Sequence, residues 1–261
     1  MLDLVNAAGR VVDGRHVYPH MFGRDGAEPG QTDAGWYDFT PVKFAPGALE
    51  LYYWTLDRSA LDLLPAKPPW IAYLDGERPE FPVEALHADL EALRRQMDAM
   101  GRDERSPDCT MSDDPNRSNP AQPYTLTRLM LGGLPTGPSG PGPVGYPLHC
   151  RLRYFDPARR RAGLPPDVAA LVERMTEDTV GVTLVNLSPL AERDLVVQGG
   201  AYAEHQLLQV AAGEGAGVPT RVDRPHVAVT LAPGAGARLD ITLRRYANRP
   251  TLAFPWTADA D

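Results

Sequence analysis

The second half of the chain is a series of short segments in which apolar residues alternate with polar ones, and this pattern constrains the fold most. The segments run over residues 179–187, 193–198, 204–211, 226–231 and 237–245. Alternation with a period of two, bounded by glycine, proline and polar residues, is typical of strands with one buried face. Strands of this length and spacing predict an antiparallel β-sandwich over residues 148–261.

Two local features of this sandwich are also predicted. Residues 226–231 and 237–245 alternate in the same way and are joined by a Pro-Gly loop at 232–236, which predicts a hairpin with one buried face. A short helix is expected near 166–175, before the strand at 179–187.

The first half of the chain has a different character, because aromatic residues separated by glycine and proline dominate it up to about Pro82. The dense aromatic residues of 48–55 predict a strand, and 70–74, which the turn signal Asp75-Gly76 follows, predict a shorter one.

A helix is expected over 83–100, where apolar residues recur at steps of three and four. Pro82 lies near its first turn and Gly101 just past its end, as helix boundaries favour. A second short helix is expected over 124–131. The stripe of the first helix is narrow, so this helix is expected to pack on one surface only.

Residues 134–147 (LPTGPSGPGPVGYP) contain too many prolines and glycines for a helix or a strand and are predicted to be a linker. The sequence therefore predicts an α+β protein. An irregular, aromatic, β-rich segment with one or two helices covers 1–133, and the antiparallel sandwich covers 148–261.

Charge and cysteine content limit the compartment and the partners. The formal net charge of -8 at pH 7 disfavours binding to nucleic acid. No stretch approaches the roughly twenty apolar residues of a membrane helix, and the start MLDLVNAAGR lacks the regions of a signal peptide. Cys109 and Cys150 are expected to be free thiols in a reducing compartment. These features predict a soluble, cytoplasmic protein that binds neither nucleic acid nor membranes.

Three stretches of the second half carry a resemblance to a known class of domain. The sequences VTLVNLSP at 182–189, DLVV at 194–197 and VTLAPGAGARL at 229–239 resemble the C-terminal β-sandwich domains appended to bacterial glycoside hydrolases and polysaccharide lyases. The resemblance implies a structural domain that packs against a catalytic barrel or toroid, and the 83–100 helix would fit the last helix of such a toroid.

Histidines four residues apart are the first candidate for chemistry. His16 and His20 would share one helix face, but Pro19 prevents that helix and no third Cys or His lies at ligand spacing, so neither a metal nor another cofactor is expected. A histidine beside a carboxylate can move a proton near neutral pH, which makes His16, His20 and Asp25 the predicted catalytic residues. Loop histidines with ordinary hydrogen bonds are the alternative.

Two aromatic clusters combine flat rings with charged groups, as sugar-binding sites do. The predicted substrate-binding residues are Trp36, Tyr37, Tyr53, Trp54, Asp57 and Arg58. The alternative is that the rings are core residues and Asp57-Arg58 a surface ion pair. A cluster of arginines between Arg151 and Arg161 is the one basic stretch, and either an anionic ligand or plain solvation explains it.

These observations favour a C-terminal portion, or a partner subunit, of a larger bacterial enzyme that acts on a carbohydrate-like substrate, with a mainly structural or substrate-binding role. The abrupt start of the chain supports this. A larger catalytic domain or subunit is then expected to pack on the N-terminal segment. The alternatives are a self-contained enzyme with a loop histidine as general base and a stand-alone sugar-binding module.

For the aromatic rings of the N-terminal segment, an interface with a partner is the alternative to burial within the chain. If a partner covers the N-terminal segment, several of its rings should form an exposed apolar patch of more than about 600 Å². The rings expected in this patch are Trp36, Tyr37, Tyr52, Tyr53, Trp54 and Trp70.

Overall fold

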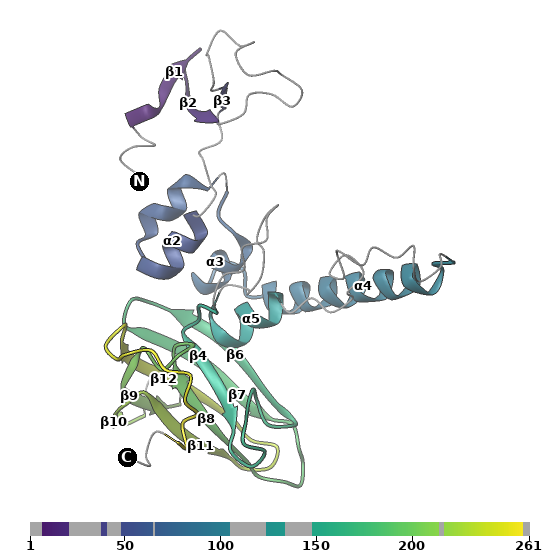
Figure 1. Cartoon of the computed structure of the whole chain (residues 1–261), viewed down its shortest axis with the longest axis vertical. Helices are drawn as coiled ribbons and strands as arrows, with labels where there is room; N and C mark the ends of the chain where they lie inside the picture. The colour runs from purple at the N-terminus through teal and green to yellow at the C-terminus, as the bar shows by residue number, and fades with distance from the viewer. Residues whose placement is uncertain are drawn as a thin grey trace. The chain divides into compact units, whose positions relative to one another are not determined.

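The structure is a computed structural model, and it describes residues 7–20, 38–40, 48–64, 66–104, 124–133, 148–213 and 217–257. The chain divides into two compact units, Met1–Pro68 and Pro69–Asp261. Helices lie mostly in the N-terminal half and strands dominate the C-terminal half, which confirms the α+β prediction (Figure 1). The predicted linker at 134–147 lies outside the described residues, so the predicted domain boundaries stay a prediction.

The first unit contains a small antiparallel sheet with the strand order β1-β2-β3. Its strands are β1 (Arg10–Val12), β2 (Arg15–His20) and β3 (Asp38–Thr40). Asp13 and Gly14 join β1 to β2, with φ of 51° and 74°. Positive φ at both residues is the backbone that two-residue hairpins need, and Asp-Gly is among the sequences that adopt it most readily.

Residues 48–55, predicted to be a strand, form helix α2 (Ala48–Thr55), so that prediction is wrong. Ala48, Tyr52 and Tyr53 are its buried residues, and their spacing places them on one helical face. Ala, Leu and Glu in the first turn are strong helix formers, whereas the aromatic residues that follow favour a strand. The burial of Tyr53 in the fold decides between them. The 3₁₀ helix η1 (Arg58–Leu63) comes next.

The strand predicted at 70–74 is also wrong, because α3 (Pro69–Leu74) occupies it. Proline suits the first turn of a helix, and here its N–H would have had no intrahelical partner. The Asp75-Gly76 signal ends a helix instead of a strand: Gly76 has φ of 78°, and its N–H donates to the Tyr73 carbonyl at 2.9 Å.

Both helices expected farther along are present. Helix α4 (Phe81–Gly101) contains the predicted 83–100 helix, and α5 (Tyr124–Leu131) matches 124–131. α5 packs against β6 and contacts the start of the sandwich. No helix among the described residues is both long enough and apolar enough to cross a membrane.

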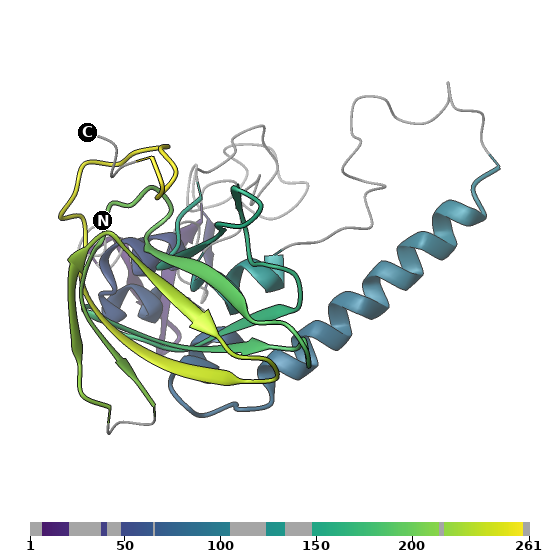
Figure 2. The same cartoon turned by 90° about the horizontal axis from the view of Figure 1, so that it is seen from below.

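Two antiparallel sheets form the sandwich, and Figure 2 shows them as two layers. The five-stranded sheet has the order β10-β9-β12-β7-β6, and the four-stranded sheet has the order β11-β8-β4-β5. The first comprises β6 (Val168–Met175), β7 (Thr179–Asn186), β9 (Gln206–Ala212), β10 (Thr220–Arg224) and β12 (Gly236–Arg244). The second comprises β4 (Leu152–Asp156), β5 (Arg161–Ala162), β8 (Arg193–Gly199) and β11 (His226–Leu231).

The core lies between the sheets, where alternate residues are buried. Val180, Val182 and Leu184 on β7 are inaccessible to solvent, and so are Leu195 and Val197 on β8. This is the expected arrangement of a sandwich whose inner faces interdigitate.

The short helix predicted near 166–175 is wrong, because these residues form β6. Ala, Leu, Glu, Arg and Met favour a helix in isolation, but β6 pairs with β7 along its whole length, with one register shift between Val172 and Arg174. Tertiary pairing therefore overrides local propensity here.

The predicted hairpin of 226–231 with 237–245 is wrong in its pairing. Both strands exist, but β11 pairs with β8, while β12 pairs with β7 and β9. The 232–236 loop therefore crosses from one sheet to the other. Alternating residues predict a strand with one buried face, but they carry no information on which strand lies beside it.

Three of the rings expected in the exposed aromatic patch are buried instead. Tyr52, Tyr53 and Trp70 are 3%, 0% and 2% exposed, whereas Trp54 is 49% exposed. Trp36 and Tyr37 lie outside the described residues. The three buried rings act as core residues, because their helices turn them inward together with small neighbours such as Ala48 and Ala72.

Candidate ligand-binding groove

A groove of about 470 Å³ opens on the sandwich between strands β10 and β11, the β4–β5 turn and the C-terminal segment that follows β12. Its walls combine aromatic, aliphatic and basic side chains. The lining residues used below are Arg221, Arg224, His226, Val227, Pro255 and Trp256.

A stacked aromatic pair stands at one side of this groove. The rings of Phe254 and Trp256 have centroids 5.0 Å apart and an interplanar angle of 10°. Phe155, buried on β4, meets both rings edge to face, at 5.9 Å and 6.0 Å. Thr257 closes the turn, since its N–H and its hydroxyl donate to the Phe254 carbonyl at 2.9 Å and 2.7 Å. The chain thereby holds a flat ring, Trp256, against the groove.

One arginine lies over this ring, and two further arginines line the groove. The Arg160 guanidinium lies 5.8 Å from the centre of the Trp256 ring, and Arg160 itself has φ of 49° in the β4–β5 turn. Arg221 and Arg224 reach the groove from β10, where the pairing with β9 shifts register between these two residues. Such a bulge re-aims neighbouring side chains at a sheet edge. Arg221 pairs with the Asp223 carboxylate, a hydrogen bond that raises the pKa of Arg221.

This arrangement suits binding better than catalysis. A flat indole offers a surface for an apolar ring face, and guanidinium groups donate charged hydrogen bonds to hydroxyl or carboxylate oxygens. His226 is the one histidine among the residues that line the groove. The described residues that line the groove supply no second acid or base to work with this histidine.

The arginines expected to form a basic cluster between Arg151 and Arg161 lie in different surroundings. Arg151 is fully buried, and Arg153 donates to the Ala201 carbonyl at 2.7 Å while lying over the Phe155 ring. Arg161 lies 3.6 Å from the carboxylate of Asp156. Of these, Arg160 lies near Trp256, a residue of the groove wall.

A polar cluster lies where β4 and β9 begin and β12 ends, and its two imidazoles are buried. The Tyr246 hydroxyl lies 3.1 Å from Nε2 of His149, and the Tyr246 N–H donates to Nδ1 of His205 at 3.2 Å. Burial, followed by the nearby Arg151 guanidinium, lowers the pKa of His149 to about 4 and that of His205 to about 3. Both imidazoles are therefore neutral at physiological pH, and this cluster joins three strands.

Cys150 lies next to this cluster and is completely buried. Burial, with a smaller effect from the Glu204 carboxylate, raises the pKa of its thiol far above the ordinary value. A thiol that stays protonated is a poor nucleophile, so Cys150 is a core residue.

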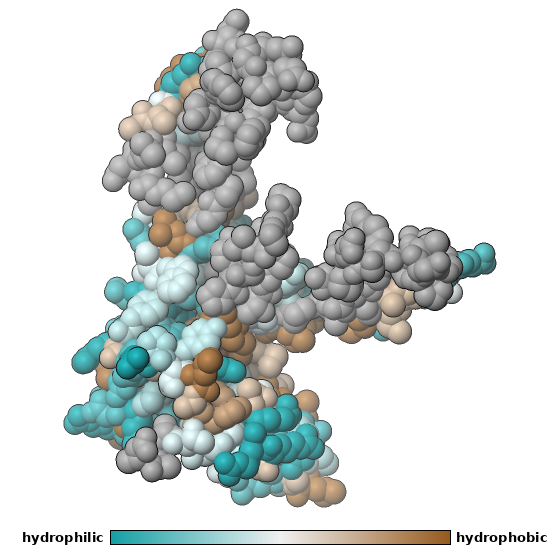
Figure 3. Space-filling view, in the orientation of Figure 1, coloured by the Kyte–Doolittle hydropathy of each residue, from teal (hydrophilic) through white to brown (hydrophobic). Residues whose placement is uncertain are grey.

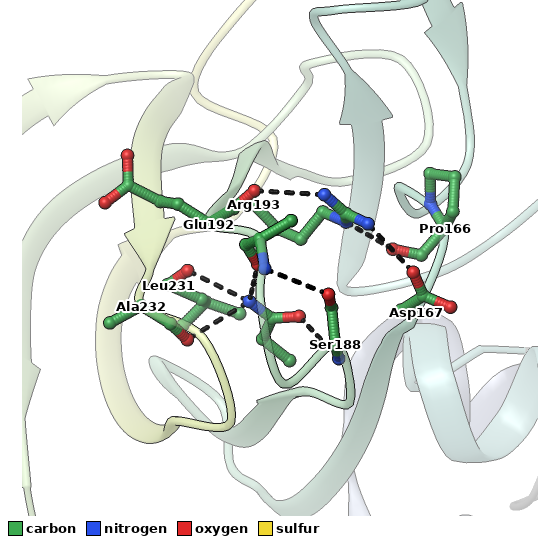
Figure 4. Close-up of polar contacts among 9 residues, drawn as sticks. Pro166, Asp167, Ser188, Glu192, Arg193, Leu231 and Ala232 are labelled. Atoms are coloured by element: carbon green, nitrogen blue, oxygen red, sulfur yellow. Dashed lines mark hydrogen bonds and ion pairs between the residues drawn. The ribbon is translucent and has the colours of Figure 1, made fainter.

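The motif Asn186-Leu187-Ser188-Pro189, which carries part of the resemblance, has a structural role. Nδ2 of Asn186 donates to the carbonyls of Ala191, Leu231 and Ala232 at 2.8 to 3.1 Å, and its Oδ1 accepts from the Ser188 N–H at 3.0 Å. Figure 4 shows these contacts converging from the loops after β7 and β11. One buried amide thus holds two sheet-crossing loops together.

Arg193 extends the same network towards the loop before β6. Its Nε donates to the Pro166 carbonyl at 3.0 Å, and its guanidinium pairs with Asp167 at 2.8 Å (Figure 4). This pair ties β8 to the loop before β6.

The predicted catalytic residues are only partly described. His16 and His20 both lie on β2, paired with residues of β1 and β3, and the positions of their side chains lie outside the described part of the structure. Asp25 also lies outside the described residues. The prediction that these three residues form a proton-transfer site stays a prediction.

The predicted substrate-binding residues are separated by their surroundings. Tyr53 is fully buried and Trp54, its neighbour on α2, is half exposed. Asp57 caps η1: its Oδ1 accepts from the Ser59 hydroxyl at 2.7 Å and from the Ser59 N–H at 2.9 Å, and these bonds lower the pKa of Asp57. Arg58 is the first residue of η1 and is exposed.

Sequence reasoning missed Trp256. It follows the last strand within the short segment Phe254-Pro255-Trp256, where no periodicity marks it. The sequence marks Trp256 only by two aromatic residues that flank a proline beyond the last strand. The stacking of these two rings follows from the fold.

Comparison with known families gives a match over α3, α4 and the start of α5. Residues 65–127 are similar to a family described as "Domain of unknown function (DUF8034)". The match lies outside the groove and covers less than half of the chain. Neither the curated proteins nor the solved structures yield a match.

Proposed function

We propose that unit Pro69–Asp261 is a binding module for a carbohydrate-like ligand, and that the groove beside Trp256 is its binding site. The observation that carries the proposal is the stacked pair Phe254 and Trp256, held at the side of a groove of about 470 Å³. The ring of a sugar stacks on an indole, while its hydroxyl groups take hydrogen bonds from basic side chains.

The charge of the groove favours a ligand with an acidic group. Arg160 lies near Trp256, Arg224 lines the same groove, and both are exposed. Guanidinium groups bind carboxylates with paired hydrogen bonds. A sugar acid is therefore expected to bind more tightly than its neutral counterpart. The resemblance to sandwich domains of glycoside hydrolases and polysaccharide lyases agrees with this ligand class.

We further propose that the module serves a larger enzyme, with a mainly structural or substrate-binding role. The groove offers binding groups without a second acid or base, which suits a part that holds the substrate while another domain or subunit performs the chemistry. A proton-transfer role for His16 or His20 is the competing proposal, and it predicts turnover by the chain alone.

Titration calorimetry of the full chain with neutral oligosaccharides and with oligomers of uronic acids tests the proposal. We expect measurable binding of the acidic series. Trp256→Ala should lower the affinity by about tenfold, since an aromatic stack contributes about 0.5–1.5 kcal/mol beyond the apolar area that it buries. Arg224→Gln should weaken the acidic series alone.

Trp54→Ala is the matched control, because Trp54 is another partly exposed tryptophan and belongs to the competing site on α2. It should leave affinity unchanged. Affinity that falls in Trp54→Ala and persists in Trp256→Ala would place the site on the first unit. Absence of binding by any member of either series, with the fold intact by circular dichroism, would refute the proposal.

A further inference from the structure

Helix α4 exposes the apolar stripe that defines it. Val83, Leu86, Leu90, Met97 and Met100 are 60%, 36%, 48%, 57% and 48% exposed. Figure 3 shows apolar residues along one edge of this helix. A stripe of large apolar side chains in water marks an interaction surface.

The stripe follows a strict seven-residue repeat. Residues 83–103 read VEALHAD, LEALRRQ and MDAMGRD, so that each heptad begins with an apolar residue, an acidic residue, an alanine and a second apolar residue. Its apolar steps alternate between three and four, with an average of 3.5, which is the period of a two-stranded coiled coil. A helix that packs on a globular core has a wider stripe with a period of 3.6.

We propose that α4 of one chain pairs with α4 of a second copy as a parallel, two-stranded coiled coil. Val83, Leu90 and Met97 then occupy the a positions, and Leu86, Leu93 and Met100 occupy the d positions. Leucine at d together with a β-branched residue at the first a position favours two strands over three or four. This assembly is independent of the ligand proposed for the groove.

Charges beside the stripe are complementary in the parallel arrangement. Asp89 occupies a g position and Arg94 the e position five residues later, which is the spacing that brings g of one helix next to e of its partner. Two-fold symmetry forms this Asp–Arg contact twice. No like-charged g–e contact arises in the other heptads, since Pro82 would face His87 and Gln96 would face Gly101.

An antiparallel pair lacks this complementarity. With the apolar stripes aligned, g positions face g and e positions face e, so Asp89 would lie beside Gln96 and Arg94 beside His87. The attractive Asp–Arg contacts would be absent, and the charge pattern therefore selects the parallel pair.

The rest of the α4 surface carries charged residues that favour exposure to solvent. Glu91 and Arg95, at b and f positions, form an exposed i,i+4 ion pair of 3.7 Å. Glu84 accepts a hydrogen bond from Arg78 at 2.7 Å near the start of the helix. The three heptads span roughly 30 Å at 1.5 Å per residue, a short seam, so the dimer is expected to dissociate on dilution.

Sedimentation velocity of the full chain over a dilution series measures this assembly. We expect the mass to double with rising concentration and the dimer to be lost in Leu90→Glu, which places a carboxylate of each chain in the centre of the apolar stripe. Ala88→Glu, at an f position, is the matched control and should leave the dimer intact. A wild-type chain that stays monomeric, or a dimer that survives Leu90→Glu, would overturn the proposal.

Charge reversal and crosslinking test the parallel arrangement without reliance on a single variant. Asp89→Arg and Arg94→Asp should each weaken the dimer, and the double variant should restore it. In a Cys109→Ser background, Met97→Cys should form an interchain disulfide on mild oxidation, since a positions face each other in a parallel pair. Singles without effect, a double variant that fails to restore the dimer, or the absence of the disulfide would exclude this arrangement.

Discussion

The Tyr246 hydroxyl lies 3.1 Å from Nε2 of His149, although 97 residues separate them in the chain. This contact joins the segment before β4 to the segment after β12. The Tyr246 N–H extends the link to His205, which precedes β9. One end of the sandwich is thus closed by a polar cluster whose two imidazoles must remain neutral.

The first prediction concerns the pH dependence of stability. His149 and His205 have pKa values of about 4 and about 3 in the folded protein and return to about 6.5 on unfolding. Between these values the unfolded chain binds protons that the folded chain does not, so the free energy of unfolding falls as pH is lowered from about 6.5 towards 4. At about 1.4 kcal/mol per pKa unit, the loss by pH 4 amounts to roughly 3 kcal/mol for each histidine.

Urea titrations at a series of pH values measure this effect. The double variant His149→Gln/His205→Gln should flatten the slope above pH 5, whereas His87→Gln, at an exposed position on α4, should retain it. An identical slope in the wild type and the double variant would show that these histidines do not set the acid sensitivity.

The second prediction concerns Asn186. Asn186→Ala removes three hydrogen bonds to carbonyls and leaves buried acceptors without a donor, so we expect a loss of roughly 2–4 kcal/mol in the free energy of unfolding. Leu187→Ala, the neighbouring residue that is 66% exposed, should change stability by less than about 0.5 kcal/mol. Equal midpoints in chemical denaturation for these two variants would contradict the structural role of the amide.

The third prediction concerns Gly133, which packs directly on the backbone before β4. A Cβ at this position would lie 2.3 Å from the His149 carbonyl oxygen and 2.8 Å from Cα of Cys150. Gly133→Ala should therefore lower the thermal midpoint by several degrees or prevent folding.

Gly101→Ala is the control for this substitution, since its Cβ meets no atom within 4 Å and Gly101 is the last residue of helix α4. Alanine is the better helix former, so stability should stay the same or rise slightly. Scanning calorimetry separates the two variants, and a tolerated Gly133→Ala would mean that β4 and the end of α5 are less closely packed.

The fourth prediction concerns the reactivity of Cys150. In Cys109→Ser, the remaining thiol is buried and its pKa is raised by burial, so it should react with a chromogenic disulfide reagent only as fast as the protein unfolds. Addition of urea beyond the unfolding transition should release full reactivity. Rapid reaction in native buffer would show that the segment before β4 opens locally.

Several features of this protein follow from the sequence by itself. The positions of β7, β8, β9, β11 and β12 follow from periodicity, because a buried face imposes a period of two on a strand. The α4 helix follows from its apolar steps of three and four. Val180, Val182 and Leu184 are buried as their alternation indicates. The start of α4 near Pro82 and its end at Gly101 follow from the local preferences of proline and glycine.

Tertiary structure decided the rest, since the competing local preferences were too close to separate. Residues 48–55 and Pro69–Leu74 are helices because the fold buries Tyr53 and Trp70 at helical spacing, and β6 is a strand because β7 pairs with it. The alternating pattern also does not identify which strands pair. The consecutive strands β11 and β12 lie in different sheets. The groove depends on this choice: Trp256, Arg160 and Arg224 are far apart in sequence, and only the packing of the sheets and the C-terminal turn brings them to one surface.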